Sequence, residues 1–288
     1  MIETAPRPRA FAQIDVFSQV PYRGNPLAVV LDGSGLTDER MARFANWTNL
    51  SETTFVLPPT DPSADYLLRI FTPGVELPFA GHPTLGSAHA WLEAGGRPKG
   101  DDIIFQCGIG LVTVARRPDL TSGAGLAFAA PVPLRRGPMD PELVSRVAES
   151  LGLSDTDIVA AEWVDNGPGW LAVLLGSAEQ VLAVEPIAAL IGDLKIGVVG
   201  PATDGGPTQF QVRAFFGQGG TVDEDPVTGS LNAGLGQWLI ESGRAPSSYI
   251  AGQGARLGRD GRVHIERVGG QVWVAGHSVT CISGSVVL

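Results

Sequence analysis

Cysteine and histidine are scarce in this sequence of 288 residues. The two cysteines, Cys107 and Cys281, cannot build a disulfide framework, and we expect reduced thiols, with a single bridge between them left open. The four histidines are scattered, and none stands at a metal-ligand spacing from carboxylates or cysteines. The sequence therefore predicts no metal site.

Positive charge and long apolar runs are also lacking. Lysine and arginine number 20 against 30 aspartates and glutamates, which gives a net charge of −10. Such a chain repels nucleic acids and anionic membranes, and no basic run offsets the repulsion. No stretch is long and apolar enough to span a bilayer, and the N-terminus MIETAPRPRAF has no apolar core of a signal peptide. We expect a soluble, cytoplasmic protein.

Cofactor motifs are missing as well. There is no Walker-type loop and no G-x-S-x-G elbow, and the glycines around Gly217–Gly220 do not follow the dinucleotide fingerprint. We therefore expect no nucleotide, flavin or metal cofactor.

What the chain does contain is many short β-type runs punctuated by dispersed glycine and proline, which predicts an α+β fold. Helices are predicted over residues 38–47, after the N-cap candidate Thr37, and over 83–94 and 231–242. Both later segments end at a glycine, Gly95 or Gly243. The predicted strands are Ile14–Phe17, Leu27–Leu31, Thr53–Leu57, Tyr66–Phe71, Ile103–Phe105, Leu111–Val114, Ile158–Val164, Leu171–Leu175, Ile196–Val199, Phe210–Phe215 and Arg262–Ile265.

These elements repeat along the chain. The run Leu27–Leu31 reappears as Leu171–Leu175, and Arg69–Phe71 returns as Arg213–Phe215, both at an offset of 144 residues. The helices align at 143 or 148, and 148 is preferred because it matches both helix starts and both helix ends. It places a loop longer by four residues within Gly217–Val227. The chain thus reads as two copies of one strand-rich unit with a central helix.

Three residues break this repeat and are candidates for chemistry. Glu52 aligns near Lys195-Ile196, His82 aligns with Ser230, and Asp225 falls within the longer loop. Each has a plainer interpretation: an exposed carboxylate at a strand start for Glu52, a helix cap for His82, a turn residue for Asp225. Together they suit proton transfer on an acidic small molecule, because the two helix starts near them attract anions.

Several ordered motifs resemble the PhzF-like family, named after the phenazine-biosynthesis isomerase. They run through essentially the whole chain: Asp15-Val16-Phe17, Gly24–Val29, Asn49–Thr53, Phe71-Thr72-Pro73, Glu76–Pro83, Asp165–Pro168, Glu224–Ser230 and Gly284–Leu288.

The resemblance implies a fold like that of diaminopimelate epimerase. This fold has two pseudo-symmetric lobes, each a β-barrel-like sheet around a central helix, with the active site in the cleft between them. We expect residues 1–125 and 276–288 in the N-terminal lobe and 126–275 in the C-terminal lobe. The resemblance also implies a homodimer that works without a cofactor.

The resemblance assigns roles to residues that match the family's motifs. Glu52 matches the proton-transferring glutamate, and His82 and Asp225 match its polar partners. To act as base and then acid, Glu52 needs a raised pKa, which burial or a nearby Asp225 would provide, with His82 sharing a proton. The residues implied to bind a substrate carboxylate or line its site are Ser51, Gly81, Thr228, Gly229 and Ser230.

The related thiol-dependent epimerases carry a cysteine just before the glycine at each helix start. Here Ala80 and Thr228 stand at those positions, which disfavours a two-thiol racemase. The resemblance implies an isomerase of a small cyclic carboxylic acid, with trans-2,3-dihydro-3-hydroxyanthranilate as the first substrate to consider. An epimerase or dehydratase of another small amino or hydroxy acid, and a non-catalytic small-molecule-binding protein, remain alternatives. Asn232 and the loop Gly217–Val222 are expected to shape the pocket.

Overall fold

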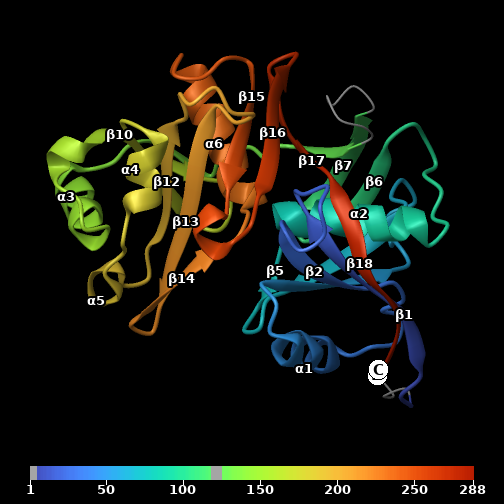
Figure 1. Cartoon of the computed structure of the whole chain (residues 1–288). Helices are drawn as coiled ribbons and strands as arrows, with labels where there is room; N and C mark the ends of the chain where they lie inside the picture. Colours follow the sequence, from blue (N-terminus) through green and yellow to red (C-terminus); the bar gives the residue numbers. More distant parts are fainter. Residues whose placement is uncertain (1–4, 118–124) are drawn as a thin grey trace. The chain divides into compact units, whose positions relative to one another are not determined.

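The computed structural model describes residues 5–117 and 125–288, so part of the polar N-terminal segment lies outside the described residues. It shows an α+β chain that folds into two compact units (Figure 1). Unit 1 comprises residues 1–129 and 275–288, and unit 2 comprises residues 130–274. Among the described residues, no helix combines the length and apolar character needed to cross a bilayer.

Unit 1 is built mainly of strands around one buried helix. Its elements in chain order are β1 (Pro8–Val16), β2 (Asn25–Val30), α1 (Asp38–Thr48), β3 (Glu52–Leu57), β4 (Tyr66–Phe71), β5 (Glu76–Leu77), α2 (Gly81–Glu93), β6 (Ile103–Cys107), β7 (Gly110–Arg117), β8 (Gly125–Ala129) and β18 (Ser278–Val287). Strand β1 pairs antiparallel with both β2 and β18, β2 pairs parallel with β3, and β3 pairs antiparallel with β4. Strand β4 pairs antiparallel with β5 and parallel with β6, and β6 pairs antiparallel with β7.

The helix α2 is the centre of unit 1. Its first eight residues are all buried, and it packs against β1, β2, β3, β7, β8 and β18 (Figure 1). The buried residues include the polar His82, Thr84 and Ser87, so the helix carries polar side chains into the core of this unit. Gly86 allows this close packing, because a Cβ there would stand 2.7 Å from Leu27 and 2.8 Å from Val16 side-chain carbons.

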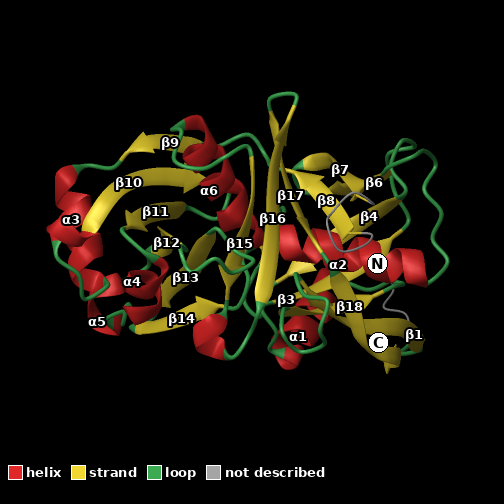
Figure 2. Cartoon of the chain, turned by 45° about the horizontal axis from the view of Figure 1, so that its top comes forward, coloured by secondary structure: helices red, strands yellow, loops and turns green. Residues whose placement is uncertain are grey.

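Unit 2 is built on the same plan. Its elements are β9 (Arg135–Pro138), α3 (Pro141–Ser150), β10 (Ile158–Asp165), β11 (Trp170–Leu175), α4 (Ala178–Ala183), α5 (Ala188–Ile191), β12 (Lys195–Pro201), β13 (Phe210–Gln218), β14 (Thr221–Asp225), α6 (Gly229–Glu241), β15 (Ser248–Gln253), β16 (Gly261–Val268) and β17 (Gln271–Gly276), through which the chain re-enters unit 1. Short 3-10 turns lie at Asp155–Asp157 and Ala255–Leu257. Helix α6 packs against β10 and β16, with its first eight residues buried (Figure 2).

The strand pairings of unit 2 follow the same order as those of unit 1. The series β10–β11 antiparallel, β11–β12 parallel, β12–β13 antiparallel, β13–β14 antiparallel, β13–β15 parallel and β15–β16 antiparallel repeats the series that starts at β1–β2. The registers agree with the predicted offset, since Leu27 pairs with Glu52 while Leu171 pairs with Ile196.

The central helices agree with the preferred offset of 148 residues, with a correction at their starts. Both begin two residues earlier than predicted, at Gly81 and Gly229, after the extended residues Ala80 and Thr228. The four extra residues lie in the β13–β14 hairpin, because Phe215 pairs with Glu224 where Phe71 pairs with Glu76. The segment Gly217–Val222 is thus a paired hairpin turn, not an open loop.

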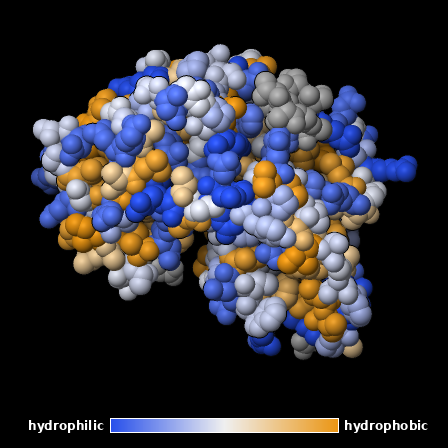
Figure 3. Space-filling view, viewed as in Figure 1, coloured by the Kyte–Doolittle hydropathy of each residue, from blue (hydrophilic) through white to orange (hydrophobic). Residues whose placement is uncertain are grey.

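Each unit has its own hydrophobic core. In unit 1 the cluster around Phe55 and Phe71 holds α1 against the sheet, and α1 starts at the predicted N-cap Thr37, whose hydroxyl accepts from the Arg40 N–H. In unit 2 the cluster around Leu171, Val198 and Phe215 packs under α3, α4 and α5. Hydrophobic side chains on the visible surface are interspersed with hydrophilic ones (Figure 3).

Candidate functional site

Glu52 and His82 meet in unit 1. Glu52 is the first residue of β3 and His82 is the second residue of α2. The Glu52 Oε2 atom lies 3.3 Å from His82 Nε2, and their side chains are 15% and 4% exposed. The interpretation of Glu52 as an exposed carboxylate is therefore wrong. His82 makes no helix-capping hydrogen bond either, so the capping interpretation is also wrong.

Local structure fixes where Glu52 stands. Helix α1 ends at Thr48 and is capped by Asn49, whose φ of 54° lies in the left-handed region that asparagine tolerates and whose N–H donates to the Ala45 carbonyl. The chain then turns through the half-buried Ser51 into β3. The Thr53 hydroxyl beyond it lies 2.8 Å from the Thr48 hydroxyl, which joins the helix end to the strand start.

His82 is electrically neutral in this setting. Burial lowers the pKa of His82 to about 3, because a charged imidazolium loses its hydration there. The Asn25 Nδ2 atom, at the start of β2, lies 3.5 Å from His82 Nδ1. With the amide as donor, Nδ1 accepts and the single ring proton sits on Nε2, the nitrogen that lies 3.3 Å from Glu52 Oε2. A neutral His82 ring thus lies beside the Glu52 carboxyl group.

Asn25 had no role predicted from the sequence, and the backbone just before it is held by the buried Asp15 side chain. The Asp15 Oδ2 atom accepts hydrogen bonds from the backbone N–H groups of Arg23, at 2.8 Å, and Gly24, at 2.9 Å. Gly24 cannot carry a side chain, because a Cβ would stand 2.1 Å from the Val16 carbonyl oxygen. The motifs Asp15-Val16-Phe17 and Gly24-Asn25-Pro26 are therefore linked by hydrogen bonds, and together they place Asn25 next to His82.

The second group of predicted residues lies in unit 2, at the start of α6. Asp225 is the last residue of β14, at the position that Leu77 occupies in unit 1, and so not within the longer loop. Its Oδ2 atom accepts the Thr228 hydroxyl at 2.6 Å. The turn role that the sequence suggested for Asp225 is observed, and Thr228 is the N-cap residue that precedes Gly229 and Ser230.

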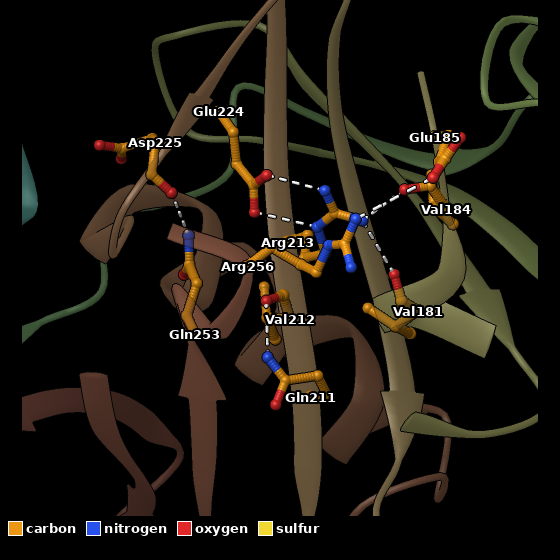
Figure 4. Close-up of polar contacts among 10 residues, drawn as sticks. All are labelled: Val181, Val184, Glu185, Gln211, Val212, Arg213, Glu224, Asp225, Gln253 and Arg256. Carbon is orange, nitrogen blue, oxygen red and sulfur yellow. Dashed lines mark hydrogen bonds and ion pairs between the residues drawn. The ribbon is translucent and has the colours of Figure 1, made fainter. Parts of the chain in front are cut away.

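Gln253, at the end of β15, organises this helix start and was missed from the sequence. Its side chain is 1% exposed. The Nε2 atom donates to the Asp225 carbonyl (Figure 4) and to the Thr228 hydroxyl, while Oε1 accepts from the Thr228 N–H at 3.0 Å. A single glutamine 28 residues beyond Asp225 carries no sequence signal, because only the fold brings β15 beside α6.

Asn232 belongs to the same network. It is fully buried, and its Nδ2 atom donates to the Thr228 carbonyl at 2.9 Å and to Gln253 Oε1 at 2.8 Å. It therefore supports the first turn of α6, which corrects its predicted role in shaping a pocket.

Arg213 and Glu224 brace the strand that carries Asp225 (Figure 4). Arg213 on β13 donates from Nε and Nη2 to the two carboxylate oxygens of Glu224 on β14, at 2.9 and 2.8 Å. Its Nη1 atom donates to the carbonyls of Val181 and Val184. This fork-to-fork pair holds the hairpin end to the sheet, one residue before Asp225.

The structure thus assembles the predicted residues in two groups. Glu52 and His82 meet in unit 1, with Ser51 and Gly81 beside them in the chain. Asp225, Thr228, Gly229 and Ser230 meet in unit 2. Both groups stand at the N-terminus of a buried central helix, where unpaired N–H groups favour anions. In the described residues no three histidine, cysteine, aspartate or glutamate side chains cluster as metal ligands would.

Known proteins resemble this chain in sequence and in fold. The family model described as phenazine biosynthesis-like protein matches residues 14–284. Antisense-enhancing sequence 1 of Schizosaccharomyces pombe is 36% identical over 290 residues, covering 96% of this chain and 97% of that protein. The trans-2,3-dihydro-3-hydroxyanthranilate isomerase of Pseudomonas fluorescens is 32% identical, covering 96% and 98%. A PhzF-family protein of Bacillus anthracis has the same fold, with a TM-score of 0.82 at 23% identity over 98% of this chain and all of that one.

Proposed function

Since the chain belongs to the phenazine biosynthesis-like family, we propose that this isomerase moves a proton on a small cyclic carboxylic acid, with Glu52 as the transferring group. The observation that carries the proposal is the pair Glu52–His82. The Oε2 atom of this mostly buried carboxyl group lies 3.3 Å from Nε2 of a neutral imidazole, and a carboxylate in this place can accept a substrate proton.

The chemistry is a proton removed and returned at a different carbon. Glu52 takes a proton from one carbon, so that a C–H bond breaks and an O–H bond forms while the double-bond electrons shift. It then returns the proton to another carbon of the same molecule. The composition and oxidation level of the substrate do not change, so the reaction needs no electron-carrying cofactor.

The substrate that the relatives favour is trans-2,3-dihydro-3-hydroxyanthranilate. The Pseudomonas fluorescens relative is named as the isomerase of this acid. Its carboxylate suits the anion-attracting helix starts at Gly81 and Gly229, and a proton on its ring is what Glu52 would move.

The helix starts also argue against thiol chemistry. The residues before Gly81 and Gly229 are Ala80 and Thr228, and neither has a thiol. Cys107 lies on β6 and Cys281 on β18, and burial raises the pKa of both thiols, which suppresses the reactive thiolate. A single carboxylate base fits proton relocation better than racemisation by two opposed thiols.

The proposal extends to the architecture of the active site. The two units act as pseudo-symmetric lobes with the site in the cleft between them, Asp225 joining Glu52 and His82, and Thr228, Gly229 and Ser230 binding the carboxylate. The repeated order of strand pairings and the matching helix starts support this arrangement. We also propose a cytoplasmic homodimer, as the family resemblance implies.

Steady-state kinetics on trans-2,3-dihydro-3-hydroxyanthranilate test the assignment of Glu52. Glu52→Gln keeps the size of the side chain but removes the base, and we expect kcat to fall by a factor of about 10²–10⁴. Glu39→Gln, at an 82% exposed carboxylate on α1, is the control and keeps wild-type turnover. Near-normal turnover by Glu52→Gln contradicts the proposal.

A further inference from the structure

The segment Asp165–Trp170, between β10 and β11, is a turn whose backbone is fixed by its first residue. The Asp165 Oδ1 atom accepts hydrogen bonds from the N–H groups of Gly167, at 2.8 Å, and Gly169, at 2.7 Å. Both glycines have a positive φ, of 140° and 91°, that other residues rarely adopt. The fixed backbone of this turn therefore fixes the positions of Asn166 within it and Trp170 at its end.

Asn166 and Trp170 both donate hydrogen bonds to Ser230, the second residue of α6. Asn166 Nδ2 donates to the Ser230 carbonyl at 2.8 Å, and Trp170 Nε1 donates to the Ser230 hydroxyl oxygen at 3.0 Å. Asn166, Trp170 and Ser230 are 8%, 4% and 8% exposed. These are buried hydrogen bonds, and such bonds hold their geometry better than exposed ones do.

The hydrogen bond from Trp170 influences whether the Ser230 hydroxyl donates or accepts a further hydrogen bond. An indole N–H is a donor only, so it occupies a lone pair of the serine oxygen and leaves the hydroxyl proton to point elsewhere. None of the hydrogen bonds among described residues has Ser230 Oγ as its donor. The hydroxyl is thus set to donate, beside helix N–H groups that also donate.

A similar contact occurs in unit 1. Asn25 at the start of β2 faces His82, the second residue of α2, as Trp170 at the start of β11 faces Ser230, the second residue of α6. In both units a side chain at the strand start contacts the side chain of the second helix residue. The strand residues are not equivalent, because at the offset of 144 residues Asn25 aligns with Gly169 and Trp170 aligns with Pro26.

We propose that Trp170 is a positioning residue that sets Ser230 as a hydrogen-bond donor to the substrate carboxylate, an inference that rests on the proposed function. Without the indole N–H, the serine hydroxyl can rotate to act as an acceptor, which repels a carboxylate. Asn166 and the Asp165 turn keep the helix start and the indole at the right separation.

A double-mutant cycle with anthranilate as the probe tests this inference. Anthranilate is a stable carboxylate of similar size to the proposed substrate, and calorimetry gives its Kd without turnover. Loss of a hydrogen bond to a charged group weakens binding by a factor of about 10 or more, so we expect Trp170→Phe and Ser230→Ala each to raise the Kd about tenfold. In the Ser230→Ala background, Trp170→Phe should change the Kd less than about twofold.

Trp163→Phe is the matched control, because it removes an indole from the neighbouring β10 without touching Ser230. It leaves the Kd unchanged. Equal effects of Trp170→Phe with and without the Ser230 hydroxyl overturn the proposal, and so does an absence of saturable anthranilate binding by the wild type. Turnover separates a loosened fold from lost positioning: we expect KM to rise with kcat nearly constant, since ground state and transition state share the carboxylate contact.

A measurement on the wild type alone guards against a variant that fails to fold. The indole N–H of Trp170, bonded and buried, should exchange with D₂O far more slowly than that of the half-exposed Trp91 in an NMR spectrum. Fast exchange at Trp170 overturns the inference. If anthranilate binds as expected but no acid is isomerised, the proposed reaction fails while the role of Trp170 stands.

Discussion

At the scale of single residues, the environment of His82 is the most informative feature of the site. A histidine that is free in water is half protonated near pH 6.5, whereas the buried ring of His82 stays neutral down to a pH of about 3. Neutrality matters for the proposed reaction, since an imidazolium would neutralise the Glu52 carboxylate that has to accept a proton. The Glu52 carboxyl group and the uncharged imidazole of His82 therefore lie side by side.

The lowered pKa of His82 makes stability depend on pH. As the pH falls below 6.5 the unfolded chain binds a proton that the folded chain refuses, so the free energy of unfolding decreases, and above 6.5 the residue contributes no pH dependence. The slope from this residue approaches about 1.4 kcal/mol per pH unit. Urea unfolding of wild type and His82→Asn at pH 7.0, 6.0 and 5.0 should show a shallower decline in the variant. Parallel declines would mean that His82 is not buried in its neutral form.

At the same scale, the candidate catalytic residues could be predicted from the sequence, whereas the residues that hold them in place could not. Glu52, His82 and Asp225 stood out because they break the internal repeat. Asn25, Trp170 and Gln253 act through hydrogen bonds to those residues or to their neighbours, and their partners lie 57, 60 and 25 residues away along the chain. Periodicity and local motifs report on near neighbours, so contacts of this kind emerge only from the fold.

At the scale of elements, the two units share an arginine–glutamate pair at the same place. Arg69 donates to Glu76 across β4 and β5, and Arg213 donates to Glu224 across β13 and β14, each through two N–H groups. Their environments differ: the unit 1 side chains are 20% and 42% exposed, and the unit 2 side chains are 5% and 11% exposed. The same arginine–glutamate pair is thus partly exposed to solvent in unit 1 and buried in unit 2.

This difference predicts unequal effects of the same substitution. Glu224→Gln leaves the buried Arg213 charge uncompensated, and we expect it to lower the free energy of unfolding by about 3 kcal/mol. Glu76→Gln, in the more exposed pair, should cost less than about 1 kcal/mol. Guanidinium unfolding of both variants against wild type measures the two values. Equal losses would show that burial does not set the strength of this pair.

The elements that the sequence predicted are those with a clear pattern. The apolar runs gave β2, β3, β4, β11, β12 and β13, and capping residues gave α1, α2 and α6. The helix α3 was missed although Asp140-Pro141 is a typical helix start, and β9, with its sequence Arg-Arg-Gly-Pro, has no strand pattern at all. Strand β9 forms because β10 offers a partner edge, an interaction that local propensity does not encode.

At the scale of the whole molecule, the two units repeat one fold but carry different residues at equivalent positions. The repeated pairings give two equivalent helix starts, and the second helix position carries His82 in one unit and Ser230 in the other. The strand position occupied by Glu52 in unit 1 is occupied by Ile196 in unit 2. Glu52 and His82 thus stand in one unit, and the donors at the start of α6 stand in the other.

The central claim is that Glu52 carries a proton between two carbons of one acid, and an NMR experiment in D₂O tests it most directly. Wild type and Glu52→Gln are each incubated with trans-2,3-dihydro-3-hydroxyanthranilate, and the hydrogen or deuterium at every ring carbon is followed. We predict that wild type yields an isomer with solvent or substrate hydrogen at a new carbon, and that Glu52→Gln yields none. Isomerisation by Glu52→Gln at the wild-type rate would contradict the claim, and so would a wild type that neither isomerises the acid nor exchanges its protons.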